Sequence, residues 1–193
     1  MRTNYHSKKD KKKFLYPNEF QKILDVANEK QKYNLLCLIN TGARINEMRN
    51  VIAQDLDNVR NNILLRVTKV RSKLGEKIPD PRTIAVSTKF FNYLKKNINN
   101  YKIYSTNNYK LMLKELSNKI GIKDYEDFSS HNMRKTFGTW MLALGIDGFK
   151  LAQHLGHDPE TLRRSYASPD IFNANDKDIM REILNDLPAR LRN

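Results

Sequence analysis

Hydrophobic residues recur at the spacing of an amphipathic helix over most of the chain. After Pro17, a residue suited to the first turn of a helix, Phe20, Ile23, Leu24 and Ala27 follow at intervals of three or one, which keep them on one helix face and predict a helix over 17–28. Similar patterns predict further helices over residues 31–40, 43–51, 88–97, 108–119, 131–144, 148–155, 159–167 and 176–187. The chain is therefore predicted to be mainly helical.

Two other stretches have the composition of strands. ILLRVTK at residues 63–69 and TIAV at 83–86 are rich in β-branched residues, and a basic segment with Gly and Pro joins them. They predict a long β-hairpin, preceded by a loop that contains Asp55 and Asp57. The predicted fold class is mainly α with a small antiparallel β-sheet, an α+β arrangement.

Chain length and charge narrow the function. The 193 residues suffice for one domain with a proper core, and 35 Lys and Arg against 21 Asp and Glu give a formal net charge of +14. This excess favours a polyanionic partner, nucleic acid first and an anionic membrane surface second. The longest apolar run, LLCLI at 35–39, is far shorter than the ~18 residues of a membrane span, and the N-terminus lacks the apolar stretch of a signal peptide. We expect a cytoplasmic, nucleoid-associated protein.

The residues that commonly bind metals form no recognisable set. Cys37 is the only cysteine and lies inside an apolar run, so it is expected to be a buried small hydrophobic residue. Asp55, Asp57 and Asp80 do not have the arrangement of a ligand cluster. No metal or other cofactor is expected.

Both ends of the chain differ from the predicted domain. Residues 1–14 carry the run KKDKKK and are expected to form a basic arm or a linker, which could contact the DNA backbone. Residues 173–193 are expected to form a tail helix with Ile179, Ile183, Leu184 and Leu187 on one face. That face can dock on its own domain or be exchanged with a neighbouring subunit.

The segment SSHNMRKTFGTW at 129–140 contains candidate phosphate ligands. Ser129 or Ser130 is expected to cap a helix, which places His131 in the first turn, where backbone N–H groups and the helix dipole favour an anion. Arg134 follows one turn later on the same face. A guanidinium beside an imidazole suits a phosphodiester, although such a pair also serves ordinary surface or capping roles.

Two further segments carry candidate cations. In TGARINEMRNV, Gly42 is suited to a left-handed cap and Arg44 follows it; the Glu47 carboxylate could orient an Arg or His, or form an ion pair within its helix. VTKVRSKLGEK places Lys69 at the end of a predicted strand, before a hairpin tip that is otherwise typical of a solvated basic loop.

A last segment, LAQHLGHDPETLRRSY, combines a Leu-Gly-His turn with a new helix. Asp158 and Pro159 are suited to the start of that helix, so Tyr166 lies about two turns into it. His157 closes the turn, and Tyr166 follows it by nine residues.

The order of these segments resembles the catalytic domain of the tyrosine recombinases, the phage-integrase and Xer-type family. TGxRxxE, a hairpin lysine, HxxR, LGH and a tyrosine at this offset occur together between about residues 15 and 172. The resemblance implies a mainly helical domain with a small antiparallel sheet. It also implies an enzyme that cuts and rejoins DNA strands through a covalent 3′-phosphotyrosine, without ATP and without an essential metal.

The resemblance implies roles for individual residues. The implied catalytic set is Arg44, Lys69, His131, Arg134, His157 and Tyr166. Tyr166 would attack the scissile phosphate, and the two arginines would hold the charge of the transition state. Lys69 would protonate the departing 5′-oxygen, with Lys73 nearby as an alternative. His131 would take or place the tyrosine proton, and His157 would hydrogen-bond the phosphate.

Other residues are expected to support this set or to contact DNA. Glu47 would support the arginines and histidines. The expected DNA contacts are Arg71, Lys73, Lys77, Lys135, Arg163 and Arg164. His154 has no role in the family and is expected to be structural or to contact the DNA backbone.

The resemblance has limits. Complete family members usually carry an N-terminal core-binding domain, for which at most 15 residues are present here, so this is either a catalytic fragment or a minimal form with weak, salt-sensitive DNA binding. The expected partners are double-stranded DNA and copies of this chain, a tetramer on DNA or a monomer in isolation, without a membrane. A topoisomerase-like relaxing enzyme and a non-catalytic DNA-binding module are the alternatives.

Overall fold

The computed structural model describes residues 14–66, 81–122, 128–156, 160 and 171–192. Its helices are α1 (Pro17–Val26), α2 (Glu29–Thr41), α3 (Ile45–Arg49), α4 (Thr88–Asn97), α5 (Thr106–Lys119), α6 (Ser130–Ala143), α7 (Gly148–Leu155), α9 (Ala174–Leu184) and α10 (Leu187–Arg192), with a short 3-10 helix at Ala53–Asp55. Its strands are β1 (Leu56–Asp57), β2 (Asn62–Leu65) and β3 (Arg82–Ala85). The predicted fold class, mainly helical with a small antiparallel sheet, is confirmed. The predicted helix over 159–167 lies outside the described residues, apart from residue 160.

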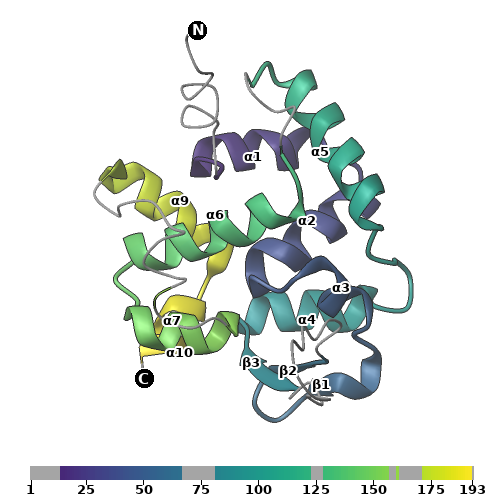
Figure 1. Ribbon diagram of the computed structural model, residues 1–193, viewed down its shortest axis with the longest axis vertical. Helices are drawn as coiled ribbons and strands as arrows, with labels where there is room; N and C mark the ends of the chain where they lie inside the picture. Colours follow the sequence, from purple (N-terminus) through teal and green to yellow (C-terminus); the bar gives the residue numbers. More distant parts are fainter. Residues whose placement is uncertain (1–13, 67–80, 123–127, 157–159, 161–170, 193) are drawn as a thin grey trace, which may run out of the picture.

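Helices α2 and α6 form the centre of the core. Figure 1 shows α6 crossing the middle of the molecule, with α1 and α5 above it, α7 and α10 below it, and the sheet at the lower end beside α4. Trp140, Phe137 and Leu38 are fully buried, because these two helices present apolar side chains to each other and to the surrounding elements. Cys37 is buried in the same core, as expected.

The first described residues are fastened to α6. The indole Nε1 of Trp140 donates a hydrogen bond of 3.0 Å to the Leu15 carbonyl. The Leu15 amide in turn donates to the Thr136 Oγ1 at 3.0 Å. These two bonds satisfy buried polar groups and hold Leu15 against α6.

The boundary between α1 and α2 differs from the prediction. Helix α1 ends at Val26 and α2 begins at Glu29, two residues earlier than predicted in each case. The reason is Asn28, whose side chain accepts from the Gln31 amide while the Gln31 side chain accepts from the Asn28 amide, both at 2.9 Å. This reciprocal cap satisfies two N–H groups and ends one helix by starting the next.

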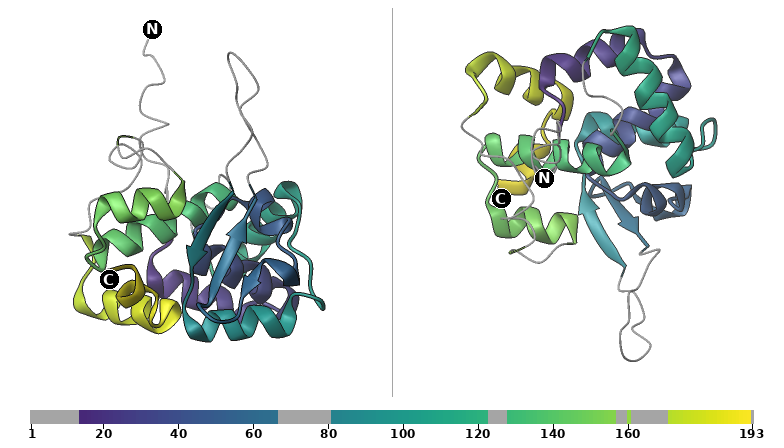
Figure 2. Two further views of the ribbon diagram at one scale, coloured as in Figure 1. Left: turned by 90° about the horizontal axis from the view of Figure 1, so that it is seen from below. Right: turned by 45° about the horizontal axis from the view of Figure 1, so that its top comes forward.

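The sheet has three antiparallel strands in the order β1-β2-β3. In the expected hairpin, Ile63 pairs with Ile84 and Leu65 pairs with Arg82. Placing Asp57 in a loop was wrong, because β1 pairs with β2 through Leu56 and Ile63. Two residues are too short for an alternating pattern, so only the neighbouring strand identifies β1. In Figure 2 the strands form a layer on one flank of the helices.

The C-terminal segment is two helices instead of the single predicted helix. Asn185 has φ 53°, a conformation that asparagine tolerates better than most residues, and it separates α9 from α10. Met180 and Leu184 are fully buried against the rest of the same chain.

Polar contacts also hold this tail in place. The Asp186 carboxylate accepts from the Thr88 amide at 2.9 Å and from the Thr88 hydroxyl at 3.0 Å. The Arg190 guanidinium donates to the carbonyls of Asn61 and Val86 beside the sheet. In this structure the tail packs on its own domain, and exchange between subunits stays a prediction. Within the described residues, no helix has the length and apolar character needed to cross a membrane.

The Gly42 turn is the point where α2, α6 and α7 meet. Gly42 has φ 60°, the left-handed conformation predicted for it. A Cβ at this position would lie 2.4 Å from Phe137 Cδ1 and 2.8 Å from Leu155 Cδ2. Glycine is therefore required both by the backbone conformation and by the packing.

Replacing Gly42 with Ala should lower the free energy of unfolding by about 2–4 kcal/mol, because left-handed strain and overpacking add. Gly121→Ala is a matched control, since Gly121 has φ 70° but open space around its Cα. That control should cost only about 1 kcal/mol of strain. Urea unfolding of both variants measures the difference, and equal losses would contradict the packing argument.

Candidate active site

The site begins at the turn between α2 and α3. Arg44 is the N-cap residue of α3, and its amide donates to Glu47 Oε2 at 2.8 Å while its Nη1 donates to Glu47 Oε1 at 2.8 Å. The Glu47 side chain is 0% exposed, whereas that of Arg44 is 46% exposed. The buried carboxylate thus orients the partly exposed Arg44 guanidinium, which was one expectation for Glu47. The same contact is an ion pair between neighbouring turns, which was the other.

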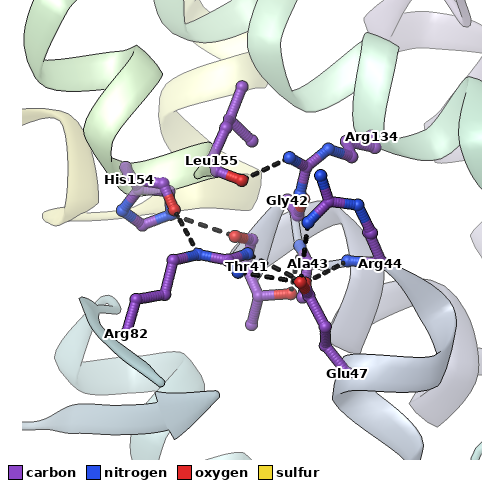
Figure 3. Close-up of polar contacts among 9 residues, drawn as sticks. All are labelled: Thr41, Gly42, Ala43, Arg44, Glu47, Arg82, Arg134, His154 and Leu155. Atoms are coloured by element: carbon purple, nitrogen blue, oxygen red, sulfur yellow. Dashed lines mark hydrogen bonds and ion pairs between the residues drawn. The ribbon is translucent and has the colours of Figure 1, made fainter. Parts of the chain in front are cut away.

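Arg82 of β3 joins this cluster and was not predicted. Its Nη1 and Nη2 donate to the two oxygens of Glu47, both at 2.8 Å, and its Nε donates to the His154 carbonyl at 3.1 Å. Figure 3 shows Arg82 reaching Glu47 from the side opposite Arg44. The alternation along β3 contained a usable indication, because Arg82 lies on the same face as the buried Ile84, and an inward arginine needs a buried acceptor.

The two arginines determine the charge state of Glu47. Burial by itself would raise the pKa of this carboxyl, but the hydrogen bonds and charge of Arg82, and the hydrogen bonds of Arg44, outweigh it and lower the pKa to about 2. Glu47 is therefore an anion throughout the physiological range. Its stabilising contribution is complete above its unfolded pKa of about 4.5 and is lost only as the pH falls through about 2.

Arg134 is buried, although it was expected on the same face of α6 as His131. Its side chain is 2% exposed, and its Nη1 donates to the Gly42 carbonyl at 2.8 Å while Nη2 donates to the Leu155 carbonyl. These carbonyls lie at the C-terminal ends of α2 and α7, where backbone acceptors lack helical partners and the helix dipoles favour a cation. The face of α6 that packs on α2 and α7 therefore buries Arg134, while His131 stays partly exposed at the surface.

His131 lies in the first turn of α6, as predicted, next to the other cations. Partial burial, followed by the positive charges of Lys135, Arg134 and Arg44, lowers its pKa from the ordinary value. These electrostatic interactions show that Arg44, from one end of the domain sequence, and Lys135, about ninety positions later, lie near the same imidazole. Ser129 is the N-cap residue, and its amide and hydroxyl both donate to the Asn132 side chain.

His154 is a structural residue in this fold. It is 6% exposed, its Nε2 donates to the Thr41 carbonyl at 3.0 Å, and its ring stacks on Phe137 with 5.3 Å between centroids. Burial lowers its pKa to about 4, against the opposing effect of the Thr41 bond. A buried neutral ring cannot contact DNA, so the structural alternative holds.

The remaining predicted site residues lie outside the described residues. They are Lys69, Arg71, Lys73, Lys77, His157, Arg163, Arg164 and Tyr166. The structure thus brings together Arg44, Glu47, His131 and Arg134, with Lys135 beside them. Among the residues that are described, no group of three or more His, Cys, Asp and Glu side chains could hold a metal ion. Asp55 instead accepts from Arg66 at 2.5 Å and from the Ile52 amide at 3.0 Å.

Comparison with known proteins identifies the family. The profile of the phage integrase family matches residues 13–171, and the chain therefore belongs to this family. The tyrosine recombinase XerA of Saccharolobus solfataricus is 30% identical to it over 142 residues, which are 72% of this chain and 46% of that protein. The chain thus spans about half the length of this curated relative.

Solved structures support the same fold. The crystal structure of XerA recombinase superimposes with a TM-score of 0.61 and 21% identity, over 88% of this chain and 64% of that one. The Tn1549 transposon integrase in complex with transposon right end DNA gives a TM-score of 0.64 and 18% identity, over 91% and 67% of the two chains. The helical arrangement around the Gly42 turn therefore belongs to a fold shared with recombinases.

The buried neutral state of His154 predicts a pH dependence of stability. Its pKa of about 4 in the folded chain lies below its usual value of 6.5, so the unfolded chain binds more protons as the pH falls below 6.5. The resulting loss in the free energy of unfolding grows until the pH reaches about 4. Between pH 7 and pH 5 it should lower the free energy of unfolding by about 2 kcal/mol.

Chemical denaturation of the unmodified chain and of His154→Gln at both pH values measures this effect. Glutamine retains a donor for the Thr41 carbonyl but does not titrate. The variant should lose about 2 kcal/mol less between the two pH values than the unmodified chain. Parallel losses in both proteins would contradict the assignment to His154.

Proposed function

We propose that this chain cleaves and rejoins strands of double-stranded DNA at specific sites through a covalent 3′-phosphotyrosine on Tyr166. The observation that carries the proposal is the convergence of Arg44, Arg134 and His131 beside the Gly42 turn, within a fold of the phage integrase family. Figure 3 shows the guanidinium groups of Arg44 and Arg134 next to this turn. Two guanidinium groups and an imidazole gathered near one turn suit a phosphodiester.

Cleavage begins when the phenolic oxygen of Tyr166 attacks the scissile phosphorus. Negative charge gathers on the non-bridging oxygens, and the fixed guanidinium groups of Arg44 and Arg134 meet it. Tyrosine has a reference pKa near 10, so surrounding positive charge is needed to make it a nucleophile at neutral pH. The lowered pKa of His131 supports a neutral imidazole, able to accept or place the phenolic proton.

The bond from phosphorus to the 5′-oxygen breaks as the phosphotyrosine forms. Lys69 gives a proton to that oxygen, with Lys73 as the alternative donor, and His157 hydrogen-bonds a phosphate oxygen. The tyrosine ester keeps the energy of the phosphodiester, so a 5′-hydroxyl can attack it and restore the strand. The proposed reaction therefore does not consume ATP.

The charge of the chain supports a DNA partner. A net charge of +14 on 193 residues favours a polyanion, and the Tn1549 integrase of the same fold was solved in complex with DNA. Strand exchange between two sites needs several active sites, so we propose a tetramer on DNA. We also propose a cytoplasmic location, where the DNA substrate is found. Lys135 of α6 and the basic residues Arg71, Lys73, Lys77, Arg163 and Arg164 would contact the backbone.

Changing Tyr166 to Phe should abolish the covalent DNA adduct and leave DNA affinity within about twofold, because one hydroxyl adds little to binding by many phosphate contacts. A library of nicked duplexes, in which the cleaved end diffuses away, traps the adduct for denaturing gels. Tyr104→Phe is the matched control and should form the adduct normally. An adduct with Tyr166→Phe would mean that another residue is the nucleophile.

The same protein distinguishes recombination from its alternatives. Exchange of strands between two matched DNA sites supports the proposal, whereas relaxation of supercoiled plasmid without exchange would favour a topoisomerase-like enzyme. Binding without any adduct would favour a non-catalytic module.

The general acid can be identified by a change in the leaving group. A substrate with sulfur in place of the scissile 5′-oxygen needs no proton donor, because a thiolate is a far better leaving group than an alkoxide. Lys69→Ala should lose about 10²- to 10⁴-fold in cleavage of the oxygen substrate and regain it with the sulfur substrate. Lys73→Ala is the matched control. The reverse pattern would assign the role to Lys73.

A further inference from the structure

We propose that Arg82 is a positioning residue of the active site, which holds Glu47 so that the Arg44 guanidinium faces the scissile phosphate. This inference rests on the proposed function and adds a residue from β3 to it. Three donor nitrogens of one planar group make three hydrogen bonds at 2.8, 2.8 and 3.1 Å, and the side chain is only 15% exposed. Arg82 is thus committed to contacts within the protein.

The first part of the argument concerns Arg44. The fully buried Glu47 carboxylate accepts from Arg82 and from Arg44, and Arg82 binds both of its oxygens in a fork. The fork from Arg82 holds the plane of the carboxylate independently of Arg44, whereas without it only the two bonds from Arg44 itself would hold Glu47. Because the orientation of Glu47 sets the direction of its bond to Arg44 Nη1, Arg82 acts on the exposed guanidinium through Glu47.

The second part concerns the end of α7. Arg82 Nε donates to the His154 carbonyl, and Arg134 Nη2 donates to the next carbonyl along the chain, that of Leu155. Gly156 follows with φ 64°, and a Cβ there would lie 3.3 Å from the Arg82 side chain. The sequence continues directly to His157 and then to Tyr166. Arg82 therefore contacts both the Glu47 carboxylate that holds Arg44 and the C-terminal end of α7, after which the sequence leads to the proposed nucleophile.

Arg66 offers a comparison within the same sheet. It directly follows β2, and its Nη1 lies 2.5 Å from Asp55 Oδ2, a carboxylate whose side chain is 1% exposed. This pair also joins an arginine beside the sheet to a buried acid, but the Asp55 carboxylate accepts from Arg66 and from the Ile52 amide, where it caps the short 3-10 helix. Because the Arg66 side chain is 48% exposed and that of Arg82 is 15% exposed, Arg66 controls for the loss of an arginine paired with a buried acid and not for an equal loss of stability.

Single-turnover cleavage of a trapped DNA substrate by the full chain tests the proposal. Arg82→Met should lower the cleavage rate about 10- to 100-fold with DNA affinity within about twofold. Arg66→Met should leave the rate within about twofold. Arg82→Lys keeps a cation beside Glu47 and serves if the Met variant does not fold; it should also lose rate, because an ammonium cannot make the fork.

Two readouts separate positioning from general stability. In an Arg44→Ala background, Arg82→Lys should lower the cleavage rate by less than about twofold further, because its effect passes through Arg44. With Arg44 intact, Arg82→Lys should also shift the acid side of the pH dependence of the cleavage rate to higher pH. The reason is that burial raises the pKa of Glu47, and the fork that opposes this effect is broken. Multiplicative losses and an unshifted acid side would overturn the proposal.

A further experiment does not depend on DNA cleavage. If the unmodified chain formed no adduct with any DNA, the proposed function would be refuted, but this experiment would still test the role of Arg82. Side-chain N–H resonances of Arg44, assigned by their loss in Arg44→Lys, report whether the guanidinium is held. Their exchange with solvent should be slow in the unmodified chain and in Arg66→Met, and at least about tenfold faster in Arg82→Lys. Unchanged exchange would overturn the role of Arg82, whatever the activity.

Discussion

The structure depends on one buried carboxylate. Glu47 accepts four hydrogen bonds of 2.8 Å, two from Arg44 and two from Arg82. A buried charge is tolerated only when it is paired and its lone pairs are used, and here both conditions are met by groups from α3 and β3. The sheet, which is small and peripheral in Figure 1, thereby supports the helix that carries the first candidate phosphate ligand.

A second buried charge has the complementary function. Arg134 brings a cation to the C-terminal ends of α2 and α7, and Phe137, one turn later, packs against the Gly42 turn. A guanidinium at two helix C-termini neutralises their dipoles and fixes their distance. In this structure Arg134 serves the core, and its contact with a phosphate is part of the proposed function.

Sequence patterns predicted most of the helices and the pairing of β2 with β3, because these depend on periodicity and local capping. They failed where one residue decides between alternatives. Asn28 both ends α1 and caps α2, Asn185 divides the tail into two helices, and β1 consists of two residues that only the partner strand identifies. None of these features changes the hydrophobic period, so the pattern contains no information about them.

The sequence by itself determined the kinds of residue and their order: Arg44, Glu47, His131 and Arg134, with the family to which the chain belongs. Only the tertiary structure decided which of them are exposed, and it added Arg82 to the set. The physical reason is that burial and long-range hydrogen bonds depend on which elements pack together. A spacing along the chain describes one helix face, whereas the partners of Arg134 and Glu47 come from the turn after α2, from β3 and from α7, which are distant in sequence.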